Sequence, residues 1–242
     1  MKQAIVLGLT LLAANSMPAA DAPGADKVKD AISKLQSAAN YSWTMTVKMP
    51  GSPFEPGPLK GQTEKLGFTT IKQEMGENTM EAVFKGTKIV LKQDGQWLLS
   101  SELDQFPAMM ANMLVRNGAA ADEADNMLKK AQELKAGDDG TVSSDYTEAG
   151  AKELLTFGPN PPKSAKGSIK YWLKDGALAK FESHLQGKIA FGPDGEENDF
   201  EMTRTFEIQD VGSTKVEPPV EAKAKLEPKP AESKPAEKPA TP

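Results

Sequence analysis

The stretch GSIKYWLKDGALAKFE, residues 167–182, contains two runs of alternating side chains joined by Asp175-Gly176. Alternation with a period of two is typical of strands that have one apolar and one polar face. An Asp-Gly pair between two such runs is a strong hairpin signal, because both residues tolerate the positive φ of a tight turn. The sequence therefore predicts an antiparallel hairpin of strands 167–174 and 177–187.

The same pattern recurs along the chain. In YSWTMTVKM, residues 41–49, large apolar side chains alternate with serine, threonine and lysine, and Asp94-Gly95 joins KIVLKQ to QWLLS in a second hairpin. The strands of this second hairpin are predicted at 87–93 and 96–100, and further strands at 59–66, 68–74, 80–85, 141–146 and 199–209. About ten antiparallel strands with one polar face predict a sheet that is covered on one side only.

The expected cover for the apolar face consists of segments 105–116 and 120–135. They belong to four segments that are predicted to be helical, which are 24–40, 105–116, 120–135 and the short segment TEAGAKELL at 147–155. The second contains FPAMMANMLV, residues 106–115, where the apolar stripe consists of Phe106, Met109, Met110, Met113 and Leu114. Such a stripe either lines a ligand space, because methionine repacks easily around different shapes, or is ordinary core.

Composition and the chain ends bound the class of protein. The 242 residues are 38% hydrophobic and 26% charged, with a net charge of −5, which disfavours a sequence-independent nucleic-acid binder.

A lysine, a short apolar run and small residues predict a signal peptide over 1–22, followed by a folded domain at 23–226. The proline-rich and lysine-rich residues 227–242 predict a disordered tail. We expect a periplasmic or extracellular protein without disulfides, since cysteine is absent.

Two segments resemble a known family. GSIKYWLKDGALAKFE and FEIQDVGSTKVEPPVEAKAKL, together with the order of helices and hairpins, resemble the LolA-like half-barrel proteins over about residues 27–226. That family includes the lipoprotein-localisation carrier, the mycobacterial LppX and LprG lipid carriers and an envelope-stress regulator. The second segment looks like the family's closing strand, followed by a proline and a short helix. The resemblance implies an α+β, mainly β fold: an open antiparallel β half-barrel with helices packed on its concave apolar face.

The resemblance also implies a space between sheet and lid helices that holds acyl chains. We expect this lipid space or its lid to include Trp43, Met45, Phe106, Met109, Met110, Met113, Phe181, Met202, Arg204 and Phe206. A carrier needs a cavity between the sheet and the methionine helix, whereas a filled core would favour a non-catalytic interaction or envelope-stress sensing module. The expected partners are a lipid, a lipidated protein or envelope proteins, and no nucleic acid; the chain is expected to be monomeric.

Arg204 is the most informative single residue. It lies on the apolar face of its strand, between Met202 and Phe206, where a guanidinium needs acceptors. Helix carbonyls, a carboxylate or a ligand headgroup would provide them, and an arginine at a strand end can instead extend to solvent.

No recognisable catalytic or metal-binding motif is present in the sequence. His184 is the single histidine and lies on the polar face of its strand. The acidic turns at 138–140 and 194–198 lack the spacing of a calcium loop. The sequence therefore predicts a non-enzyme without cofactor or metal.

Overall fold

The computed structural model describes residues 24–52, 56–76, 78–105, 107–108, 111, 114, 119–137, 139–156, 161–190 and 197–227. For Met75, Asn78, Ala190 and Glu197 it describes only the backbone. Two predicted segments lie outside the described residues: the signal peptide and residues 228–242 of the tail. The same holds for four of the predicted lid residues, which are Phe106, Met109, Met110 and Met113. Their roles stay predictions.

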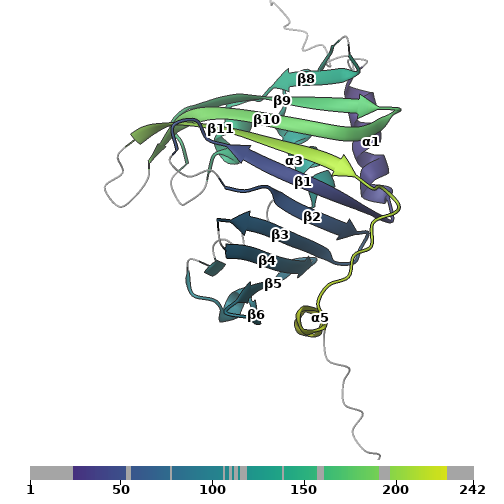
Figure 1. Ribbon diagram of the computed structural model, residues 1–242. Helices are drawn as coiled ribbons and strands as arrows, with labels where there is room; N and C mark the ends of the chain where they lie inside the picture. The colour runs from purple at the N-terminus through teal and green to yellow at the C-terminus, as the bar shows by residue number, and fades with distance from the viewer. Residues whose placement is uncertain are drawn as a thin grey trace, which may run out of the picture.

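Within the residues that the structure describes, one antiparallel sheet of 11 strands forms the body of the protein (Figure 1). Its order is β6-β5-β4-β3-β2-β1-β11-β10-β9-β8-β7, so the first and last strands pair at its centre. The strands are β1 Asn40–Lys48, β2 Leu59–Glu64, β3 Thr69–Met75, β4 Asn78–Lys85, β5 Lys88–Gln93, β6 Gln96–Leu99, β7 Lys135–Ala136, β8 Thr141–Asp145, β9 Ala165–Lys174, β10 Ala177–Ala190 and β11 Glu197–Gln209. The sheet curls but does not close, which confirms the predicted half-barrel.

Both predicted Asp-Gly hairpins are confirmed. Asp94 and Gly95 have φ of 49° and 80°, and Asp175 and Gly176 have φ of 53° and 73°. Two consecutive residues with positive φ are the signature of the turn whose twist matches that of the flanking strands. The turn residues therefore set the register of β5 with β6 and of β9 with β10.

Helices α1 (Ala25–Ser37), α3 (Ala120–Lys130) and α4 (Glu148–Leu154) contribute to the core on the concave face. The predicted helix 120–135 is too long, because its backbone becomes extended at Ala131, which bridges to Tyr146. Residues 135–136 then add the short strand β7 to β8. Backbone pairing with the sheet edge thus overrides the helical spacing of Leu134, which is buried all the same.

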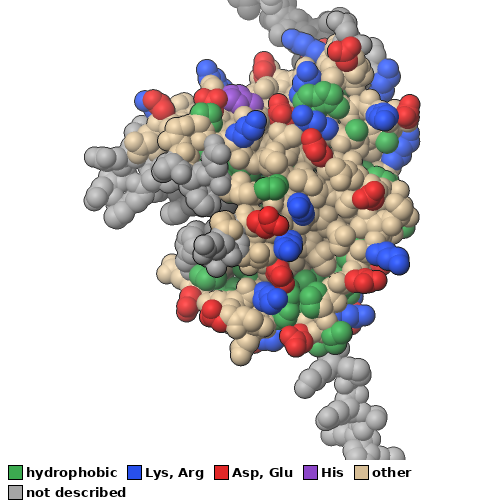
Figure 2. All heavy atoms as spheres, viewed as in Figure 1, with side chains coloured by type: hydrophobic (Ala, Val, Ile, Leu, Met, Phe, Trp, Pro, Cys, Tyr) green, Lys and Arg blue, Asp and Glu red, His purple; other side chains and the backbone are tan. Residues whose placement is uncertain are grey.

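The prediction that only one face is covered is wrong in part. Helix α5 (Val220–Leu226) packs on the opposite, convex face, where Val83, Val90 and Trp97 form a second cluster with Ala222 and Leu226. The rest of that face carries intermixed lysine and acidic side chains (Figure 2). Among the helices of the described residues, none is both long and apolar enough to cross a membrane.

Gly61 on β2 is required by the packing of Trp43. A Cβ at this position would lie 2.1 Å from Trp43 Cε2, and the Trp43 indole is fixed by donating to Thr63 Oγ1 at 3.0 Å. We expect Gly61→Ala to lower the free energy of unfolding by about 1–3 kcal/mol through overpacking. Urea denaturation measures this, with Gln62→Ala, an exposed neighbour on the same strand, as the control. Equal midpoints for the two variants would contradict the prediction.

Candidate functional site

The concave face of the sheet is organised in rows, because paired strands place inward side chains side by side. In the central row, Phe181 of β10, Phe206 of β11 and Met45 of β1 are successive partners. The rings of Phe181 and Phe206 stack with centroids 4.4 Å apart, and Trp43 lies 6.1 Å from Phe206. Trp43, Phe181 and Phe206 are at most 4% exposed and form the centre of the core.

These positions bear directly on the residues predicted for the ligand space. Trp43, Phe181, Met202 and Phe206 are buried core residues in this structure, whereas Met45 is half-buried. The sequence placed all five on the correct face of the sheet. Their contact with a ligand stays a prediction.

A strip of half-buried apolar side chains continues from this core toward the end of β1 and the start of β11. The inner strip consists of Met45, Val47, Met49, Met80 and Phe200. Leu103 and Leu114 are also half-buried against the same core. Large apolar side chains that stay partly exposed on a concave face are typical of the lining of a binding groove.

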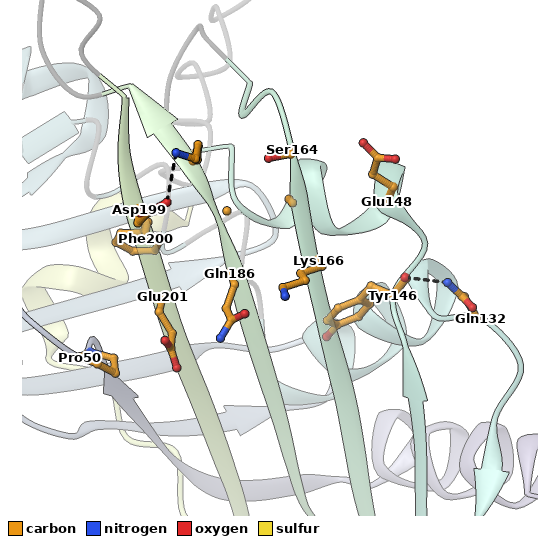
Figure 3. A pocket seen from close by; sticks show the side chains of 13 residues that line it. Pro50, Gln132, Tyr146, Glu148, Ser164, Lys166, Gln186, Asp199, Phe200 and Glu201 are labelled. Carbon is orange, nitrogen blue, oxygen red and sulfur yellow. Dashed lines mark hydrogen bonds and ion pairs between the residues drawn. The ribbon is translucent and has the colours of Figure 1, made fainter.

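A cavity of about 930 Å³ opens at the same end of the sheet (Figure 3). We call it the strand-end cavity. Its lining is Pro50, Gln132, Tyr146, Glu148, Ser164, Ala165, Lys166, Gln186, Gly187, Lys188, Asp199, Phe200 and Glu201. Phe200 belongs to both the inner strip and this cavity, so the apolar strip continues into an opening with a polar rim.

Arg204 points into the molecule, as its place in the strand predicted, and the acceptor it finds is a carboxylate. Its Nη1 lies 2.9 Å from Oε1 of Glu123 on α3, and the two side chains are 9% and 2% exposed. The pair therefore joins the helix layer to the middle of the concave face. An ion pair removed from water in this way stabilises little on balance, but removing one partner alone is costly.

Further polar groups surround this ion pair. Tyr146 donates from its hydroxyl to Ser183 Oγ at 2.8 Å, and Ser183 is the direct strand partner of Arg204. Glu123 also accepts from the Asn126 amide at 3.3 Å. Burial raises the pKa of the Glu123 carboxyl, and the nearby Arg204 charge offsets this only in part. Burial likewise raises the pKa of the Tyr146 hydroxyl, which therefore acts as a neutral donor.

Helix α3 is fixed to the sheet by two more polar contacts besides the ion pair. The backbone N–H of Ala121 donates to Tyr41 Oη at 3.2 Å, and the Tyr171 hydroxyl donates to the carbonyl of Ala124 at 3.0 Å. Alanines at 120, 121 and 124 are buried and let the helix backbone approach the sheet closely. The helix is therefore held in one defined position above Arg204.

Sequence reasoning missed Glu123, Tyr146 and Ser183, although two of them carried a signal. Glu123 lies three residues after Ala120 and four before Met127, which puts a carboxylate on the apolar face of its helix. Ser183 lies between Phe181 and Leu185 on the inward face of its strand. Polar residues on apolar faces indicated that a buried polar cluster would form. They did not indicate which of these side chains would contact one another.

Comparison with known proteins gives structural likenesses only. No protein-family model and no curated protein matches the sequence. Among solved structures, the chain is similar to LprF from Mycobacterium bovis, with 12% identity, a TM-score of 0.45 and coverage of 82% of this chain and 97% of that one. The lipoprotein LppX of Mycobacterium tuberculosis is 8% identical, with a TM-score of 0.45 and coverage of 80% of this chain and 97% of that one.

A LolA superfamily protein from Nitrosomonas europaea is 10% identical, with a TM-score of 0.34 and coverage of 79% of this chain and 94% of that one. LppX and the LolA superfamily are also names within the family that residues 167–182 and 206–226 resemble. Identities of 8–12% with TM-scores of 0.34–0.45 imply nothing about the ligand or activity of this chain.

Proposed function

We propose that the protein is an exported, soluble, non-catalytic carrier that shelters a lipid or acyl chain between the half-barrel sheet and the helices on its concave face. The observation that carries the proposal is the inner strip, which remains half-buried and leads from Met45 to Phe200 at the strand-end cavity. An apolar ligand on this strip would remove the exposed area from water. The expected partner is a lipid or a lipidated protein, and the expected working unit is a monomer.

The residue type that dominates the inner strip is methionine, which suits a ligand surface better than a branched apolar side chain does. Met45, Met49 and Met80 are three of its five members. Their unbranched, polarizable side chains adopt many rotamers and fit ligands of different shape. A surface of this kind suits acyl chains, which offer apolar area but few directional contacts.

Native mass spectrometry of protein purified from its host is the direct test. We expect a population heavier than the mature polypeptide by the mass of a lipid, and loss of that mass after extraction with organic solvent. A single species at the polypeptide mass, together with no uptake of lipid from vesicles by the same preparation, would exclude the carrier.

Substitution of Met45 tests the strip itself. We expect Met45→Gln to reduce lipid uptake about tenfold, while changing the free energy of unfolding by about 1 kcal/mol or less, because the site is already half-exposed. Thr46→Gln, on the outer face of the same strand, is the matched control. Uptake measured with a fluorescent fatty acid should separate the two variants, and equal uptake would argue against the strip.

A second candidate is an interaction or envelope-stress sensing module with a filled core. The close stacking of Phe181 on Phe206 and the fixed position of α3 favour it. Such a module would purify without lipid and would bind a protein through its surface. The same mass measurement therefore separates the two candidates.

A further inference from the structure

We propose that Arg204, Ser183 and Tyr146 form a subsite for the anionic group of an amphiphilic ligand, and that the Glu123 carboxylate occupies this subsite in the ligand-free protein. The chemical class is a carboxylate or phosphate attached to an apolar chain. This inference deepens the proposed carrier function and rests on it.

The first support is the incomplete pairing of Arg204. Glu123 reaches the guanidinium through Nη1, while Nε of Arg204 is buried and has no hydrogen-bond partner among the described residues. A guanidinium prefers a carboxylate or phosphate that accepts from two of its nitrogens at once. Glu123, held by its helix backbone, leaves this second donor unused, whereas an oxyanion free to reorient could use it.

The second support is the presence of hydroxyl donors beside the guanidinium. Ser183 accepts the hydrogen bond from Tyr146, so its own proton remains available to donate. Ser183 pairs with Arg204 across β10 and β11 and lies on the same inward face. The permanent positive charge of Arg204 and the Ser183 hydroxyl, which Tyr146 holds in place, form a suitable donor set for a carboxylate or a phosphate.

The third support is the route to this cluster. Tyr146 contributes to the wall of the strand-end cavity, as Figure 3 shows, and its hydroxyl reaches the cluster. Val47, a member of the inner strip, is the strand partner of Arg204 on the other side. A ligand with its anionic group at Arg204 would therefore lay its apolar chain along Val47 and Met49 toward Phe200 and the cavity.

Glu123 is suited to act as a replaceable occupant. Exchange of its carboxylate for that of a ligand leaves Arg204 paired, so no unpaired charge is created in the core. Burial raises the pKa of Glu123, which lowers the cost of releasing it as a neutral carboxyl group. Ligand binding would then loosen one of the contacts that hold α3 on the sheet.

The test compares a long-chain fatty acid with its methyl ester on protein stripped of lipid, by displacement of a fluorescent fatty acid. For the unmodified protein we expect the acid to bind about tenfold more tightly, which corresponds to about 1.4 kcal/mol. Glu123→Gln should raise affinity for the acid about tenfold further and leave affinity for the ester unchanged. Asp122→Asn, an exposed carboxylate on the same helix, should change neither.

Two further arms complete the experiment. The double variant Arg204→Met, Glu123→Met removes the charged pair together and should bind acid and ester equally, with folding checked by its melting curve. Inorganic phosphate at millimolar concentration reports whether the subsite takes the free anion, in which case it should compete with the acid but not with the ester. Acid-selective binding without such competition would assign the subsite to the headgroup of a lipid.

The outcomes are distinguishable. Equal affinity for acid and ester in both the unmodified protein and Glu123→Gln would overturn the anionic subsite and leave the carrier function standing. No binding of either compound by a folded, stripped protein would overturn the carrier function as well.

Discussion

Arg204→Leu is expected to lower the free energy of unfolding by about 3–5 kcal/mol at neutral pH, because it leaves a buried carboxylate without its partner. Glu123 is 2% exposed at its side chain, and Asn126 supplies one hydrogen bond that cannot replace a charge. Thermal and urea unfolding measure the loss. Lys60→Leu, an exposed position on β2, is a control for the loss of one positive charge and should change little.

The loss in Arg204→Leu should depend on pH in a defined direction. Burial already raises the pKa of Glu123, and removal of Arg204 raises it further. A carboxyl whose folded pKa exceeds its unfolded pKa favours folding below the unfolded value and loses that contribution as pH rises through the folded value. The variant should therefore be closer to the unmodified protein near pH 4 than at pH 8, using about 4.3 for the unfolded carboxyl.

A second substitution separates two effects of Arg204→Leu: the unpaired charge that it leaves on Glu123, and the contacts that the Arg204 side chain loses. Adding Glu123→Leu to Arg204→Leu removes both charges, and replacement of a buried ion pair by apolar residues is often neutral or stabilising by about 1–4 kcal/mol. We expect the double variant to recover most of the stability lost in the single one. If Arg204→Leu alone unfolds like the unmodified protein at pH 8, the ion pair has no structural role.

Phe181→Ala is expected to lower the free energy of unfolding by about 3–5 kcal/mol, because it opens a cavity in a fully buried part of the core. Phe181 is 0% exposed, stacks on Phe206 at 4.4 Å and lies 6.2 Å from Tyr171. Its neighbours come from two other strands and cannot close the gap by a side-chain rotation alone. Denaturant unfolding of protein stripped of lipid is the measurement.

This substitution also tests the role that the sequence suggested for Phe181. If the ring mainly lines a ligand space, Phe181→Ala should unfold at nearly the same denaturant concentration as the unmodified protein and lose lipid uptake only. His184→Ala, on the outer face of the same strand, should lower the free energy of unfolding by about 1 kcal/mol or less. An equally small loss of stability in Phe181→Ala would show that the ring does not belong to the core.

The strands and hairpins were accessible from the sequence because they depend on local chemistry. Alternation fixed which side chains of 41–49 and 199–209 face inward, and two Asp-Gly pairs fixed tight turns. The same local logic failed at 131–136, where helical spacing continues but the backbone pairs with β8 instead. The apolar spacing of 131–136 does not show that the neighbouring segment 141–146 will take up its backbone hydrogen bonds.

The sequence by itself determined that Arg204 faces the core, since a strand cannot turn one residue of an alternating series outward without a bulge. It also determined that Glu123 and Ser183 interrupt apolar faces. Only the tertiary structure decided that Glu123, 81 positions earlier by residue number, is the partner of Arg204. That choice depends on where α3 lies over the sheet, which follows from Tyr41, Tyr171 and the small alanines at the interface rather than from any local pattern.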